Sequence, residues 1–199
     1  MYDYTDIILH YLERQLIKRF RKLKSILHID EISVMQMTAE VYADVEQLIR
    51  KMFVQLAVHA YKDAAEKSDK IPDFYWLDVL LTDYDPVAKY IFTNELERKR
   101  AKLAEAMLSV GDVAKEVDAG MRAVAFMIKE FAVRITDEAV MKAFRDDGVK
   151  YARWVTEHDG RVCDVCMARD GKIYPLAKFP DKPHYGCRCT RERVVKSEK

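Results

Sequence analysis

All four cysteines of the chain lie between residues 163 and 189, and one histidine lies among them. The order is Cys163-x-x-Cys166, a spacer, and then His184-x-x-Cys187-x-Cys189. A C-x-x-C turn lets two thiolates converge on one ion, and a second ligand pair completes a tetrahedron around zinc. We therefore predict a structural Zn²⁺ site formed by Cys163, Cys166 and two of His184, Cys187 and Cys189. Cys187 and Cys189 are the favoured closing pair, because residues two apart in an extended segment point to the same side.

Two other states of these cysteines stay open at this point. A segment of about forty residues with few large apolar side chains buries little surface, so a metal or a disulfide is the expected source of its stability. Reducing surroundings favour zinc, oxidising surroundings favour disulfides, and free, partly buried thiols are the third state. Catalytic zinc is disfavoured, because four protein ligands leave no position for water and no His-Glu-x-x-His or His-x-Glu pattern is present.

The first 149 residues have the pattern of a helical body. Gly and Pro number only 6 and 5 in the whole chain, which is typical of a mostly helical protein. Apolar residues recur at three- and four-residue steps over residues 6–27, 34–56, 86–111 and 113–144, with a short aromatic segment over 74–83. The predicted helix starts are Ser33, Asp73, Asp85-Pro86 and Asp112, and the predicted end of the last helix is Gly148.

The pattern changes after Gly148. Short strand-like pieces at 151–155 and 172–174 alternate with Asp-Gly turns at 159–160 and 170–171, which predicts small hairpins. We therefore predict a mainly α protein. An extended helical body, residues 1–149, is followed by a small α+β or β-hairpin module, residues 150–199, that zinc stabilises.

Charge and hydropathy limit the partners. Residues 150–199 carry twelve Lys/Arg and seven Asp/Glu, a net +5 in a chain whose total is +1. This modest excess suits a nucleic acid, an acidic protein surface or an ordinary solvated surface, and any DNA contact is predicted to be weak, indifferent to sequence and sensitive to salt. No apolar run approaches the roughly 18 residues of a membrane span, and the start lacks a basic and then apolar leader. We expect a soluble protein made in the cytoplasm, with no membrane partner.

Enzyme signatures are missing from the sequence. There is no Gly-rich phosphate loop and no Gly-x-Ser-x-Gly elbow. His10, His28 and His59 lie in helical stretches and His158 in a turn, none with a partner at ligand spacing, so we interpret each as structural. We expect a protein that is not an enzyme.

One ordered motif in the tail resembles a known family. It runs Trp154-Val155-Thr156, Asp159, Arg161-Val162-Cys163, Cys166, Asp170-Gly171-Lys172, Pro183-His184 and Cys187-Arg188-Cys189. This is similar to the closing motif of the Mu F-like head morphogenesis proteins, the minor head proteins of phages. Thr136-Asp137-Glu138 and the charged stretch 95–100 resemble the helices that precede it there. The strong resemblance covers residues 150–192, and a weaker one begins near residue 86.

The resemblance implies a minor capsid protein that is made in the cytoplasm of a host bacterium and carried in low copy number in the virion. Such a protein acts near the portal in head assembly or DNA packaging. Its partners would be the portal protein, the major capsid protein or both, contacted through the helical body.

Two competing functions use the same residues. A zinc-supported nuclease of the ββα-metal type also combines C-x-x-C pairs, Asp-Gly turns and a hairpin histidine. It needs a general-base His and a further metal-binding His or Asn, and the tail offers only His158 and His184. A zinc-finger DNA-binding regulator would suit the basic tail, but the helical body lacks a clear recognition helix.

Overall fold

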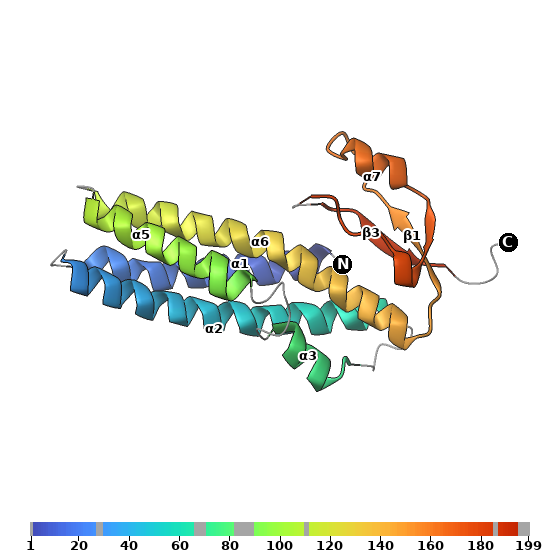
Figure 1. Ribbon diagram of the computed structural model, residues 1–199, viewed down its shortest axis with the longest axis horizontal. Helices are drawn as coiled ribbons and strands as arrows, with labels where there is room; N and C mark the ends of the chain where they lie inside the picture. The colour runs from blue at the N-terminus through green and yellow to red at the C-terminus, as the bar shows by residue number, and fades with distance from the viewer. Residues whose placement is uncertain are drawn as a thin grey trace. The chain divides into compact units, whose positions relative to one another are not determined.

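Amphipathic helices make up most of the chain, as the apolar stripes predict. The computed structural model describes residues 2–26, 30–65, 71–81, 90–109, 112–184 and 187–194. The helices are α1 (Tyr2–Phe20), α2 (Glu31–Ala64), α3 (Phe74–Leu81), α5 (Glu97–Ser109), α6 (Val113–Asp146) and α7 (Asp164–Arg169), with the 3-10 helices η1 (Arg21–Ser25) and η3 (Leu176–Lys178) and the π-helix η2 (Tyr90–Leu96) (Figure 1). The strands are β1 (Tyr151–Val155), β2 (Ile173–Pro175) and β3 (Thr190–Arg193). The mainly α class with a small β-containing C-terminal part is confirmed.

The start of α2 differs from the prediction. The backbone N–H of Ser33 donates to Asp30 Oδ1 at 2.9 Å, and the Ser33 hydroxyl donates to Asp30 Oδ2 at 2.7 Å. Asp30 is therefore the N-cap, and Ser33 lies inside the first turn. The prediction of Ser33 as the cap was wrong because the helix begins two residues earlier, at Glu31, and Asp30 satisfies the free N–H of its first turn.

Two other predicted helix starts are confirmed. Asp73 Oδ1 accepts from the backbone N–H of Trp76 at 2.7 Å, and Asp112 Oδ1 accepts from that of Lys115 at 3.1 Å. Each carboxylate satisfies a donor that the first helical turn leaves free. The predicted start at Asp85-Pro86 lies outside the described residues.

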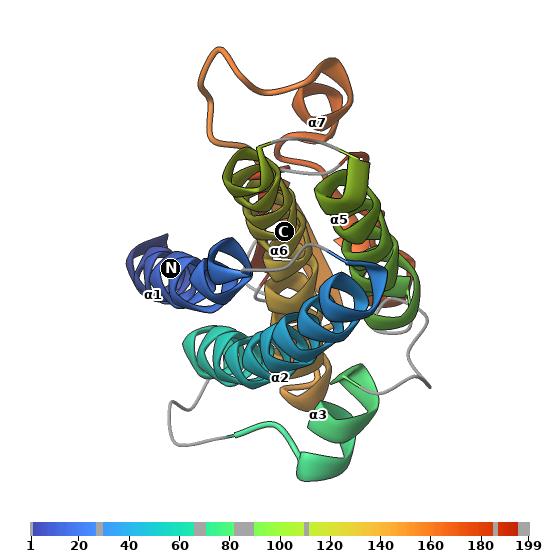
Figure 2. The same cartoon turned by 90° about the vertical axis from the view of Figure 1, so that its left-hand side faces the viewer.

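The chain is divided into two compact units. One consists of Met1–Leu56 with Asp73–Phe131, and the other of Ala57–Pro72 with Ala132–Lys199. In the first unit α1, the first part of α2, α5 and the first part of α6 lie side by side (Figure 2). Their shared core contains Leu12, Leu16, Phe20, Ile49, Phe53, Leu103, Met107, Val124 and Ile128, all buried. The stripes of the sequence are thus the faces that the helices bury against one another.

The second unit contains a three-stranded antiparallel sheet in the order β2-β1-β3. Ala152 pairs with Tyr174 of β2 on one side and with Arg193 of β3 on the other. This unit also takes in the last turns of α2 and α6. The predicted boundary near residue 149 falls just after the end of α6. The unit that holds the sheet begins earlier in the chain, because it also includes Ala57–Pro72 and the part of α6 that follows Phe131.

The strands of the predicted small hairpins pair, but within residues 151–175 they are not joined directly by an Asp-Gly turn. β1 and β2 are antiparallel neighbours, but α7 lies in the segment that joins them. Asp170 ends α7, and Gly171 has a φ of +70°, a left-handed conformation that glycine adopts without strain. The Asp-Gly pair at 170–171 therefore ends a helix, and the prediction of a hairpin turn there was wrong.

Gly148 ends α6 as predicted. Its φ is +70°, its N–H donates to Arg145 O at 3.0 Å, and the N–H of Val149 donates to Phe144 O at 2.9 Å. These two bonds form a Schellman motif, which satisfies carbonyls at the helix end.

Alanine at position 148 is expected to lower the free energy of unfolding by about 1 kcal/mol, because the left-handed conformation strains a residue with a Cβ. Urea unfolding measures this difference. Gly160→Ala is the matched control, since Gly160 does not have a positive φ and no atom lies within 4 Å of the added Cβ. Equal effects of the two substitutions would contradict this expectation.

Within the described ranges, no helix combines the length and the apolar character that crossing a membrane requires.

Candidate metal centre

The Cys163-x-x-Cys166 motif lies at the N-terminus of α7, a helix that the sequence pattern did not predict. Cys163 is the N-cap, and its sulfur accepts a hydrogen bond from the backbone N–H of Cys166 at 3.4 Å. This hydrogen bond is the main reason why the pKa of Cys163 is lowered, and His184 acts in the same direction. The helix start thus brings both thiols to the same side and stabilises one of them as a thiolate.

Cys187 and Cys189 approach from the segment just before β3. Both side chains are buried, and Cys187 Sγ lies 3.5 Å from Cys166 Sγ. Burial raises the pKa of Cys166 and that of Cys189. Residues separated by more than twenty positions therefore meet inside the small core of this unit.

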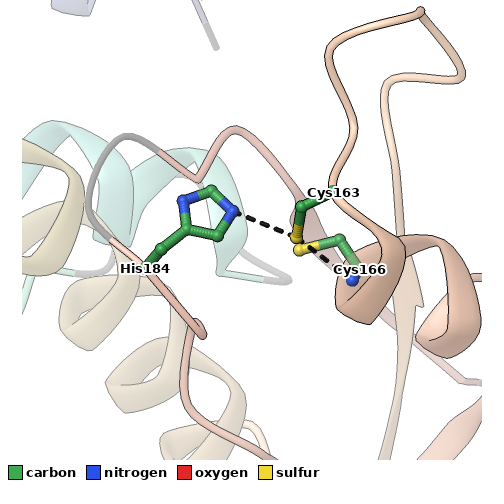
Figure 3. Close-up of side chains that lie close together, drawn as sticks. All are labelled: Cys163, Cys166 and His184. Carbon is green, nitrogen blue, oxygen red and sulfur yellow. Dashed lines mark hydrogen bonds between the residues drawn. The ribbon is translucent and has the colours of Figure 1, made fainter.

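His184 reaches the other side of the C-x-x-C turn. Its Nε2 lies 3.2 Å from Cys163 Sγ, and the imidazole edge points toward the two sulfurs of the turn (Figure 3). His184 is exposed, whereas Cys166 has only 1% of its surface exposed. The histidine thus lies at the solvent side of the cluster.

The five predicted ligands form two overlapping groups. Cys163, Cys166 and His184 form one, and Cys166, Cys187 and Cys189 form the other. Within each group the ligand atoms lie within 4.8 Å of one another. Zinc–sulfur bonds of about 2.3 Å place the sulfurs of a tetrahedral site about 3.8 Å apart, so both groups have separations near those of a metal site. Cys166 belongs to both groups and is the centre of the cluster.

The five residues also surround a common cavity. Its volume is about 20 Å³, and its lining includes all five. That is enough room for one ion but little more. The donor set suits a soft or borderline metal, since it consists of sulfur and imidazole nitrogen. The residues present therefore fit the zinc ion that the sequence predicts.

An aromatic layer supports the cluster. Trp154, in β1, is buried and belongs to the same core as Cys166, Cys187 and Cys189. The ring of Phe179 stacks on the indole with centroids 5.7 Å apart. Because β1 is hydrogen-bonded to a strand on each side, the position of Trp154 is fixed, and its ring packs against the buried cysteines.

Ion pairs fix the loop that carries the second ligand group. Asp137 of α6 binds Lys182 Nζ at 3.0 Å and Arg191 Nη1 at 3.3 Å. Lys182 Nζ also donates to the carbonyl of Cys187 at 3.1 Å. Burial raises the pKa of Asp137, and the two cations oppose that effect. We name these three side chains, Asp137, Lys182 and Arg191, the loop anchor.

No local pattern in the sequence predicts the loop anchor, because its members lie up to 54 positions apart and each resembles a surface charge. Their burial is the property that distinguishes them. In the structure the exposed side-chain fractions are 17% for Asp137, 14% for Lys182 and 8% for Arg191.

No protein-family model, curated protein or solved structure matches this chain. The geometry of the site is therefore the main guide to function.

His158 belongs to a different cluster. Its Nε2 lies 3.4 Å from Asp170 Oδ2, and Asp170 Oδ1 accepts hydrogen bonds from the N–H and the hydroxyl of Thr156 at 2.9 and 3.0 Å. His158 is a member of neither metal-ligand group. His10 and His59 likewise lie near Glu13 and Asp63 on their own helices. His28 lies outside the described residues.

Proposed function

We propose that Cys163, Cys166 and two of His184, Cys187 and Cys189 hold one structural Zn²⁺. The observation that carries this proposal is the convergence of five sulfur and nitrogen donors on one ion-sized cavity. With four protein ligands the zinc shell is closed, so the ion would hold chain segments together and would have no position for a reacting water. The small sheet gains stability from such a cross-link, because its own apolar core is small.

We further propose that the chain is a phage minor head protein of the Mu F-like type, which acts in low copy number near the portal. Support comes from the ordered motif, whose separate parts contact one another in the second unit. Thr156 binds Asp170, and Trp154 packs in one core with Cys166 and Cys187. A motif whose parts fold together into one unit is a better marker of common ancestry than the same residues scattered over a surface.

The partner in this proposal is the portal or the major capsid protein, and the site of action is the assembling head. The test has two parts. A portal gene immediately upstream, with scaffold or capsid genes downstream, is the expected gene order. Heads assembled with the chain present should then retain it in a few copies per particle, as measured by quantitative mass spectrometry. A metabolic or regulatory gene neighbourhood, or heads that never retain the chain, would contradict the proposal.

The nuclease alternative predicts plasmid nicking with Mg²⁺ or Mn²⁺. We expect no nicking, because a nuclease of this type needs two histidines, or a histidine and an asparagine, at its metal site. One metal-ligand group contains a single histidine, His184, and the other contains none. Metal-dependent nicking that disappears in His184→Ala would overturn the expectation that the chain is not an enzyme.

DNA binding, where it occurs, is expected to be weak and indifferent to sequence. Its affinity should fall steeply between about 50 and 200 mM salt, since Lys and Arg contacts with phosphate release counterions. Fluorescence anisotropy with two unrelated duplexes measures this. Tight binding that prefers one duplex at high salt would favour the zinc-finger regulator instead.

A further inference from the structure

A groove of about 610 Å³ lies between α1 and α2 of the first unit. Part of its lining is apolar and includes Ile7, Tyr11, Leu48 and Met52. Ile7 is 59% exposed and Tyr11 is 44% exposed, and the two lie on neighbouring turns of α1. The groove therefore offers apolar surface to an occupant.

The polar part of the lining is basic. Arg14, Arg19 and Lys51 contribute positive charge, whereas the acidic Asp44 is already paired with Lys22 at 3.3 Å. Among the described residues, neither Arg14 nor Lys51 has a hydrogen-bond or ion-pair partner. The Nε of Arg19 is buried without a hydrogen-bond acceptor. Charge complementarity thus favours an occupant that is both acidic and apolar.

The chain itself contains such a segment. Residues 71–88 include four Asp and no Lys or Arg, together with four aromatic residues. α3 lies within this segment and buries Leu77 and Leu81. Its Tyr75 is 79% exposed, and Asp78 is exposed with no charged partner in the described part of the chain. α3 therefore presents an outward face that is aromatic and acidic.

This face does not meet the groove of its own molecule. In Figures 1 and 2, α1 lies above α2 and α3 lies below it. A contact between α3 and the groove must therefore join two molecules.

We propose that the α1–α2 groove binds the exposed face of α3 from a second copy of this chain. Tyr75 would enter the apolar part of the groove, and Asp78 would approach Arg14 and Lys51. The contact is small and rich in charge, so the association is weak and becomes weaker as salt screens the charges. It joins two different surfaces, which permits rings as well as pairs. The proposal is independent of the metal centre.

Sedimentation velocity of the full-length chain tests it. The wild type is expected to associate with increasing concentration at low salt. The groove variant R14E/K51E and the helix variant D78K should each have a dissociation constant raised at least about tenfold. A mixture of the two variants should associate again, because the D78K chain supplies an intact groove and the R14E/K51E chain supplies an intact α3.

K18E/R21E is the matched control. It makes the same change of charge next to the groove but alters no lining residue, so its association should equal that of the wild type. Far-UV circular dichroism establishes that each variant is folded. A wild type that stays monomeric up to about 200 µM at low salt would overturn the proposal. Failure of the mixture to associate, or normal association of D78K alone, would overturn it as well.

Discussion

Serine at position 166 is expected to cause the largest loss of metal of any single substitution in this protein. Cys166 belongs to both ligand groups, so each group loses a member at once. A structural zinc site contributes about 10–16 kcal/mol over four ligands, and one ligand therefore accounts for a factor of roughly 100 to 1,000 in affinity. We expect the zinc dissociation constant to rise by at least about 100-fold, measured by competition with a chromogenic chelator.

The same substitution should loosen the second unit. Hydrogen exchange of β1, β2 and β3 should become faster, while α1 and α5 of the first unit keep their protection, because those helices have a core of their own. Ala168→Ser is the control, since it introduces the same side chain on an exposed position of α7. A C166S chain that binds zinc as tightly as the wild type would show that the cluster is not the metal site.

Asparagine at position 137 is expected to lower the free energy of unfolding of the second unit by about 3 kcal/mol. The amide has nearly the shape of the carboxylate but leaves the largely buried side chains of Lys182 and Arg191 without their counter-charge. Removing one member of a buried ion pair typically costs about 3–5 kcal/mol, and the partial exposure of Asp137 places this case at the lower end. Urea unfolding in a Trp76→Phe background, where Trp154 is the remaining tryptophan, measures the change by fluorescence.

This substitution should also weaken metal binding, because Lys182 holds the carbonyl of Cys187. The zinc dissociation constant is expected to rise about tenfold, the size typical of changes just outside a metal's own ligands. Glu138→Gln is the matched control: its side chain is about half exposed, and its loss should change stability by less than about 0.5 kcal/mol. If D137N and E138Q had equal effects, the loop anchor would have no role in positioning the ligands.

The helices could be predicted well because their determinants are local. Leu12, Leu16 and Phe20 of α1 follow one another at helical spacing and are all buried. Gly148 marks the end of α6 because a left-handed residue is needed there. The five candidate ligands could also be found, since sulfur and imidazole side chains crowded at short spacing are typical of a metal site.

Other features depend on contacts between distant residues and leave little local signal. β3 pairs with β1 across a long stretch of chain, and its Thr-Arg-Glu-Arg sequence has no apolar alternation. α7 has only six residues, which is too short for a helical stripe. The loop anchor depends on burial that arises only when α6 meets the loop before β3. Sequence spacing likewise favoured Cys187 with Cys189, but only folding reveals that His184 comes within 3.2 Å of Cys163.

The metal content of the wild-type protein tests the central claim most directly. Elemental analysis of the chain purified under reducing conditions should find about one zinc ion per molecule. Titration with a thiol reagent should find the four cysteines protected until a chelator is added. Protein without zinc, in which all four thiols react freely in the folded state, would contradict the account.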